Sequence, residues 1–299
     1  MLDGLAYGLF AALVWGFTDI CAALAARRLG GLATVAAVQA TSFAGLCLFA
    51  LLTADGSAFD LGVAPRAAAL GIASAIAYIS FFTGLGLGPI AVVSPVASAY
   101  GGLTVILAVV LLGERLTASQ GLGAGLATLG ILSVGLRAEG HWRSTRFVGP
   151  GVPLAIVSLV TWAFVTIGIT MLVRETSLVS VLLVARGANT LTVWILLWVR
   201  RWRRRWRHRG RSGAESPAGP PPARILALAI LGGALDVAGY VVYATGLQRS
   251  LAWVVGLSSS FGPAIAILVA VVILGERLRR VQWFGLAMLA VGIVLIGLR

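Results

Sequence analysis

The chain contains no lysine, and it has only two histidines and two cysteines in 299 residues. The absence of lysine excludes a retinal pigment, because such a protein holds its chromophore as a Schiff base on a lysine amine. His141 and His208 lie in polar stretches between apolar runs, so we expect neither a Ser/His dyad nor a zinc motif inside a membrane. Cys21 and Cys47 stand among apolar residues and are expected to be packing residues. The sequence therefore predicts a protein that is not an enzyme and has no cofactor and no metal.

Charged residues are also scarce. They make up 11% of the chain, hydrophobic residues make up 59%, and the mean hydropathy is +0.99. This composition excludes a soluble globular domain with an ordinary polar surface. A membrane span needs about 20 apolar residues to cross about 30 Å of hydrocarbon, so the chain has room for roughly ten spans. We predict an all-α membrane protein with ten transmembrane helices and no large domain outside the bilayer.

Apolar windows of about 19 residues predict where the spans lie. They fall near residues 4–26, 32–53, 67–87, 89–112, 117–136, 151–173, 178–199, 224–247, 250–274 and 281–298. Most connections are only a few residues long, so consecutive helices are expected to be antiparallel neighbours. The exception is the stretch 200–224, in which arginines alternate with Pro, Gly and Ser. That composition predicts a long loop.

The sequence repeats itself at an offset of 162 residues. The tripeptide AVV at 108–110 and the tetrapeptide GERL at 113–116 recur at 270–272 and 275–278. Further matches at this offset pair Tyr78 with Tyr240, Thr83 with Thr245, Gly123 with Gly285, and Gly130 with Gly292. Chance does not maintain one register over four predicted helices, so the chain contains an internal duplication.

Nearer the N-terminus the offset is 147, where Trp15 and Phe17 match Trp162 and Phe164. The difference between the two offsets is close to the length of the Arg-rich insertion. We therefore predict two homologous halves, 1–146 and 147–299, with the Arg-rich loop 200–224 in the second. Each half has five spans, and because five is odd, the second half must enter the membrane from the side opposite to the first. Two inverted five-helix repeats are typical of transporters, with the substrate site near the midplane between the halves.

Loop arginines predict the orientation. With the N-terminus outside, the cytoplasmic loops would hold 17 arginines and the outer loops 5. Because cytoplasmic loops carry the excess of positive charge, we predict a multi-pass protein of a bacterial inner membrane with both termini in the periplasm. The formal charge of +13 then reflects membrane topology, and no nucleic-acid partner is expected. The expected partners are the lipid bilayer and a small-molecule substrate, for a monomer or a homodimer.

Several short motifs at corresponding places in the two halves carry a family resemblance. They are Trp15-Gly16-Phe17 in the first span, Ser94-Pro95 and the GERL at 113–116 around the fourth, and Pro263 with the GERL at 275–278 around the ninth. With the glycine-spaced fifth and tenth spans, they make the whole chain resemble the ten-helix, EamA-type branch of the drug/metabolite transporter superfamily. The halves have diverged where Pro263 matches Gly101 and where Ala163 follows Trp162.

The resemblance implies a carrier that works by alternating access between the two repeats. Members of this branch export amino acids and related metabolites, and the aromatic-rich helices look most like those of its bacterial exporters of aromatic and other neutral amino acids. The alternatives are export of organic cations and drugs, or of nucleotide-linked metabolites. A cation site would use aspartates without a membrane arginine, and a nucleotide site would need more basic groups. A channel or a purely structural protein would not need inverted halves with matched aromatics.

Three charged residues fall inside predicted spans, where charge is costly and marks functional candidates. Asp19 and Asp236 could each pair with a substrate ammonium or carry a coupling proton, and the alternative is that each only fixes helix packing. Arg186, which aligns with Gln39 at the offset of 147, could bind a substrate carboxylate. It could instead reach the interface or pair with a buried aspartate as a structural tie. An equivalent polar residue in both halves favours the structural interpretation.

Six aromatic residues lie within spans instead of at the two interfaces, where an aromatic belt would be. They are Trp15, Tyr78, Tyr100, Trp162, Tyr240 and Tyr243. Such positions predict the wall of a cavity that binds apolar or aromatic groups and orients them with tyrosine hydroxyls. Trp162 is expected to be the strongest single contact, and helix packing is the alternative for each ring.

Two glutamates, Glu114 and Glu276, end the predicted fourth and ninth spans, and an arginine directly follows each. We expect them to form local ion pairs at the interface and to mark span boundaries. The closely spaced glycines of the fifth span, from Gly121 to Gly130, predict close approach of another helix.

Overall fold

A computed structural model describes residues 2–53, 61–88, 90–134, 150–208, 223–265 and 280–297. These residues form α-helices joined by short connections, with one 3₁₀ turn, η1 (Leu61–Val63), and no strand among them. The helices are α1 (Leu2–Leu29), α2 (Gly31–Thr53), α3 (Ala64–Leu87), α4 (Ile90–Ser98), α5 (Tyr100–Leu112), α6 (Ala118–Val134), α7 (Gly151–Glu175), α8 (Leu178–His208), α9 (Ala223–Arg249), α10 (Ala252–Ser259) and α12 (Arg280–Gly297). A helix satisfies its own backbone polar groups, as hydrocarbon requires.

The helices correspond to the ten predicted spans. Eight stretches have the length and hydropathy of a membrane span, and one of them, Val92–Leu112, joins α4 to α5. The two shorter apolar spans are α6 and the stretch Ala252–Ile265. The fourth span is interrupted at Ala99, whose backbone N–H lies within hydrogen-bonding distance of the carbonyls of both Pro95 and Val96. The predicted all-α membrane fold with ten transmembrane helices is confirmed.

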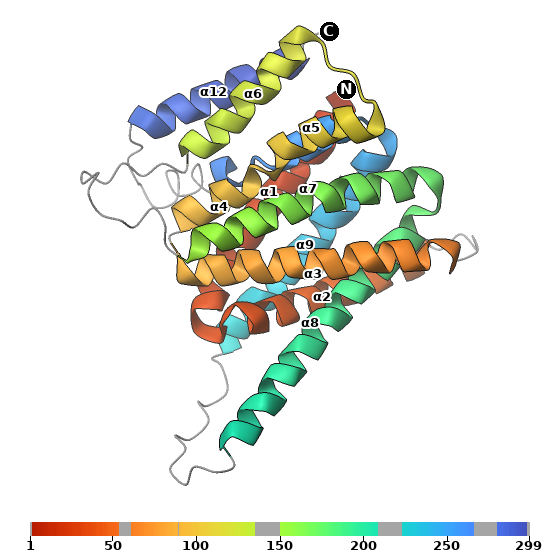
Figure 1. Cartoon of the computed structure of the whole chain (residues 1–299), viewed down its shortest axis with the longest axis vertical. Helices are drawn as coiled ribbons and strands as arrows, with labels where there is room; N and C mark the ends of the chain where they lie inside the picture. The colour runs from red at the N-terminus through yellow and green to blue at the C-terminus, as the bar shows by residue number, and fades with distance from the viewer. Residues whose placement is uncertain are drawn as a thin grey trace.

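The structure corrects one boundary. The sequence predicts a loop from Arg200, but α8 continues as helix to His208 and extends beyond the other helices at the lower edge of Figure 1. Arginine is a good helix former, and the first glycine after the span is Gly210, so nothing in the sequence ends the helix sooner. Where this extension begins, the rings of Trp198 and Trp202 stack with centroids 6.3 Å apart.

Contacts between the halves follow the repeat. Gly71 lies against the carbonyl of Ala185, and its counterpart Gly233 lies against the carbonyl of Val38, the counterpart of Ala185. A Cβ atom at either glycine would overlap that carbonyl, so both positions allow α3 and α9 to approach their neighbours closely. Each contact therefore recurs with the halves exchanged. This relationship is a pseudo-two-fold axis between inverted repeats.

The same symmetry joins α6 to α12, which lie side by side at one edge of the bundle (Figure 1). A Cβ at Gly123 would meet the carbonyl of Gly292 at 2.8 Å, and a Cβ at Gly130 would meet that of Gly285 at 2.7 Å. Glycine thus lets the two backbones touch, as small residues do in bilayers. The neighbouring Gly121, in contrast, faces open space, so the predicted close approach holds for only part of the glycine series.

Candidate substrate cavity

A cavity lies between the two repeats and is bordered by α1, α3, α4, α5, α7, α9 and α10 (helix positions in Figure 1). Its aromatic lining residues are Trp15, Tyr78, Phe81, Phe82, Tyr100, Trp162, Tyr240 and Tyr243. Its polar lining residues are Thr18, Asp19, Ser74, Ser98, Thr166, Asp236 and Ser259. The volume open to the centres of water molecules is about 100 Å³, and one water needs only about 10–15 Å³. The cavity is therefore large enough for a small organic molecule.

The two tryptophans of the cavity have equivalent surroundings. Trp15 packs against Tyr243 with ring centroids 5.1 Å apart, and Trp162 packs against Phe81 at the same distance. Phe81 and Tyr243 are equivalent at the offset of 162, so the two aromatic pairs are equivalent, and each joins one half to the other. Trp162 also contacts Tyr78 edge to face at 5.5 Å. These rings give the cavity two aromatic walls.

The most buried charges form an ion pair beside the cavity. The guanidinium of Arg186 lies 3.0 Å from a carboxylate oxygen of Asp236, and the two side chains are 2% and 1% exposed. Ser42 donates to the same carboxylate at 2.7 Å and Tyr78 donates to it at 2.9 Å, so Asp236 has three partners. Arg186 also donates to the side-chain oxygen of Gln39. The structure thus shows the predicted alternative in which Arg186 pairs with a buried aspartate.

Asp19 is in a different situation. Its carboxylate lines the cavity and accepts a hydrogen bond from Ser94 at 3.3 Å. Among the described residues, the ion pairs join Arg66 to Glu175, Arg174 to Glu114 and Arg186 to Asp236. None of these pairs includes Asp19, so the cavity has one carboxylate that no arginine of the described ranges neutralises.

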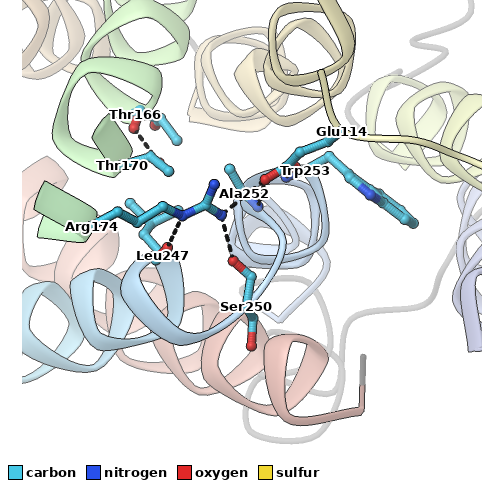
Figure 2. A network of polar contacts seen from close by, with 8 residues as sticks. All are labelled: Glu114, Thr166, Thr170, Arg174, Leu247, Ser250, Ala252 and Trp253. Carbon is cyan, nitrogen blue, oxygen red and sulfur yellow. Dashed lines mark hydrogen bonds and ion pairs between the residues drawn. The ribbon is translucent and has the colours of Figure 1, made fainter. Parts of the chain in front are cut away.

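At one end of the bundle, Glu114 links the two repeats through a network of polar contacts (Figure 2). Its carboxylate accepts hydrogen bonds from the backbone N–H groups of Ala252 at 2.9 Å and Trp253 at 3.1 Å, the first turn of α10. Arg174 donates to it at 2.9 Å and also to the carbonyl of Ser250 at 2.7 Å. The carboxylate is therefore a cap for a helix N-terminus, where negative charge is favourable.

This network corrects the expected role of Glu114. The predicted ion pair was local, yet the partner is Arg174, 60 residues along the chain, and every group that Glu114 binds belongs to the second half. The backbone turns at Gly113, which has a positive φ of 66°, and the carboxylate of Glu114 after this turn reaches α7 and α10. Glu276 lies outside the described residues.

Eight of the nine predicted site residues border the one cavity: Trp15, Asp19, Tyr78, Tyr100, Trp162, Asp236, Tyr240 and Tyr243. Arg186 instead lies behind the wall, with its guanidinium carbon 3.9 Å from the centre of the Tyr240 ring. Sequence reasoning missed Phe81 and Thr166. Both could have been found from the repeat, since Phe81 is the counterpart of Tyr243 and Thr166 is the counterpart of Asp19.

Comparison with known proteins agrees with this architecture. A solved structure described as "Crystal structure of protein" matches with a TM-score of 0.75 at 19% identity, over 99% of this chain and 96% of that one, which shows the fold alone. No curated protein matches the chain. Two stretches, residues 2–136 and 149–298, match the model of the EamA-like transporter family. They cover nearly the whole chain, one stretch in each half, so the protein belongs to the EamA-like family of multi-pass membrane transporters, which are carriers of small molecules and not enzymes.

Proposed function

We propose that this transporter carries a small organic monocation, in its simplest form a primary amine with an aromatic or other flat apolar body. The observation that supports the proposal is the unpaired carboxylate of Asp19 in a cavity walled by aromatic rings. A carboxylate without a counter-charge is costly inside a membrane span, and a substrate ammonium would remove that cost.

The balance of charge at the cavity favours a cation over other substrates. The described charges there are Asp19, Asp236 and Arg186, and they sum to one negative charge. A bound monocation makes the site neutral, whereas a zwitterion leaves one negative charge and an anion leaves two. In a region of low dielectric constant, each uncompensated charge weakens binding.

The walls suit the rest of such a molecule. Trp15 and Trp162 present indole rings on the two sides of the cavity, and tryptophan gives the strongest attraction between a ring face and an organic cation. Aromatic walls also bury apolar area and pack against a flat ring of the substrate. The proposed substrate therefore has a charged end at Asp19 and an apolar body between the tryptophans.

Export of aromatic and other neutral amino acids is the second candidate. The same aromatic walls favour it, and Asp19 would hold the α-ammonium group. Its difficulty is the α-carboxylate, because Arg186 already pairs with Asp236 and does not border the cavity. A nucleotide-linked metabolite finds still less support, since its phosphates would need free basic groups at the cavity. For either candidate we propose export by alternating access between the two repeats.

A matched set of three ligands tests the proposal. Phenethylamine, phenylalanine and 3-phenylpropionate share one aromatic body and differ in charge, and their binding to purified protein in nanodiscs can be measured by tryptophan fluorescence and calorimetry. We expect phenethylamine to bind at least about tenfold more tightly than phenylalanine, and 3-phenylpropionate to bind most weakly.

Asp19→Asn should remove the preference for phenethylamine. Asp3→Asn is the matched control, because it is the same change on the same helix at an exposed position. Tighter binding of phenylalanine than of phenethylamine would favour the amino-acid candidate. An unchanged preference in Asp19→Asn would contradict the role given to this carboxylate.

We also propose that both termini face the periplasm of a bacterial inner membrane, from the excess of arginine in the loops on the other side. Alkaline phosphatase fused to the C-terminus should then be active, and green fluorescent protein fused there should be dark. The opposite pattern would reverse the orientation without changing the cavity.

A further inference from the structure

Four hydroxyl groups gather at the wall of the cavity that belongs mainly to the second half. Tyr100 and Ser259 share a hydrogen bond of 2.6 Å, and Thr166 and Tyr243 share one of 2.8 Å. All four side chains line the cavity, and their exposed fractions lie between 3% and 7%. We call these two hydrogen-bonded pairs the hydroxyl cluster.

The protons of this cluster can be assigned. Ser259 donates its one proton to the carbonyl of Gly256 at 2.9 Å, so Tyr100 must be the donor in its bond to Ser259. The bond between Thr166 and Tyr243 uses one of their two protons. The other proton of this pair is available to a neighbouring hydroxyl of the cluster or to a bound molecule.

The equivalent place in the first half has different chemistry. The counterpart of Thr166 is Asp19, and the counterpart of Tyr243 is Phe81, which has no hydroxyl. The pseudo-two-fold axis relates these two places, and each half contributes one of them to the lining of the cavity. One place therefore offers a carboxylate that accepts hydrogen bonds, and the other offers a neutral hydroxyl pair with a proton to donate.

We propose that Thr166 and Tyr243 form a second polar subsite, which donates a hydrogen bond to a neutral acceptor such as a carbonyl at the end of the substrate remote from its amine. This inference rests on the proposed function, because Asp19 must hold the ammonium for the far end to reach Thr166 and Tyr243. The substrate class is then an amphiphilic amine with a charged head, a flat apolar body and a neutral carbonyl or similar acceptor at its tail.

A neutral acceptor fits this wall better than a charged one. The cluster contains four hydroxyls and no cationic group, so a carboxylate there would restore the negative charge that the amine had neutralised. A neutral hydrogen bond contributes modestly to affinity, but a site built around one discriminates against an isostere that cannot make it.

Two ligands of the same shape test the subsite. They are phenethylamine with an acetyl group in the para position and its para-isopropyl isostere, which lacks the acceptor oxygen. We expect wild-type protein in nanodiscs to bind the acetyl compound about three to ten times more tightly. Tyr243→Phe, which installs the residue of the first half, should reduce this ratio to about one while binding of the isopropyl compound stays the same.

Thr166→Val removes the other hydroxyl of the pair and should give the same loss of discrimination. Tyr7→Phe, which removes a hydroxyl from a tyrosine of α1 that does not line the cavity, is the matched control and should leave the ratio unchanged. Melting temperatures of all variants show whether each is folded.

The outcomes separate the two proposals. If neither the para-acetyl nor the para-isopropyl compound binds to the wild-type protein, the proposed function is wrong, and the proposed subsite is wrong as well. If both bind with equal affinity, or if Tyr243→Phe weakens both equally, the amine site stands and the hydrogen-bonding subsite is wrong.

Discussion

Arg186 and Gln39 occupy equivalent positions in the two repeats, and the guanidinium of Arg186 donates a hydrogen bond to the side-chain oxygen of Gln39. Two equivalent residues can touch only where the pseudo-two-fold axis passes between them. The flanking rings agree, because the guanidinium carbon lies 3.9 Å from the centre of Tyr240 and 5.6 Å from that of its counterpart Tyr78. The axis therefore passes beside a buried charge.

The ion pair at this axis should stabilise the fold as a unit. Asp236→Asn leaves the guanidinium of Arg186 buried without a counter-charge, and breaking such a pair costs about 3–5 kcal/mol. We expect a clear fall in the free energy of unfolding, measured in mixed micelles. The double variant Arg186→Gln/Asp236→Ser copies the residues Gln39 and Ser74 of the first half and should recover much of the loss. A wild-type unfolding midpoint for Asp236→Asn would show that the pair is not a structural tie.

Trp162 should contribute to both binding and packing. Its ring contacts Tyr78 at 5.5 Å, Phe81 at 5.1 Å and Tyr100 at 5.9 Å. Loss of the indole should weaken binding of phenethylamine by about one power of ten, which corresponds to 1.4 kcal/mol. Trp162→Phe keeps a ring against these neighbours, so we expect weaker binding at a nearly unchanged melting temperature, whereas Trp162→Ala should lower both. Trp283→Phe, on the exposed side of α12, is the control and should change neither.

Glu114 should control access to the cavity from its end of the bundle. Glu114→Gln removes the charge that holds Arg174 and caps α10, so α5 and α10 should separate more often. We would measure the rate at which an impermeant maleimide labels Ser259→Cys in protein whose two native cysteines are replaced by alanine. Several-fold faster labelling is expected in the presence of Glu114→Gln.

Another ion pair provides the control for Glu114. Arg66 and Glu175 lie 3.1 Å apart at the same end of the bundle, but their side chains are 59% and 58% exposed. Exposed pairs contribute only about 0–1 kcal/mol, so Arg66→Gln should leave the labelling rate unchanged. Equal rates in both variants would show that Glu114 does not hold this end closed.

The contact between α6 and α12 should tolerate no side chain at its glycines. Gly130→Leu places a side chain against the backbone of Gly285 and should lower the free energy of unfolding by about 1–3 kcal/mol. Gly125→Leu makes the same change where nothing lies within 4 Å, and a change of less than about 0.5 kcal/mol is expected. Thermal unfolding in detergent measures both, and equal losses would contradict the contact.

Much of the fold could be predicted because hydropathy and the repeat are both strong signals. Bilayer thickness determines the length of a span, so the ten spans could be predicted from the apolar runs. The inversion of the two halves followed from the internal repeat at the offsets of 147 and 162. The end of α8 was missed because arginines read as a polar loop, although nothing in Arg200 to His208 breaks a helix. The end of the apolar run marks where the chain leaves the hydrocarbon region. It does not mark the end of the helix, because a helix can continue beyond the membrane.

The candidate site was predictable only where its residues are unusual for a membrane interior. Asp19, Arg186 and the mid-span tryptophans are costly or conspicuous there, and the structure brings them to one place. Phe81 and Thr166 are ordinary residues of apolar helices, so only their equivalence to Tyr243 and Asp19 could have revealed them. An offset shows that Arg186 and Gln39 are equivalent, but it does not show how far either lies from the axis, and so their contact was not foreseen.

The contact between Arg186 and Gln39 has an evolutionary consequence. In a dimer of two identical halves, a residue on the axis meets its own copy, so an arginine there would face a second arginine. In one chain with two halves that constraint does not hold, since one half can have the charge while the other has an amide. The same freedom lets one wall of the cavity carry the aspartate and the other the threonine, and it gives the cavity a polarity that no symmetric ancestor could have had.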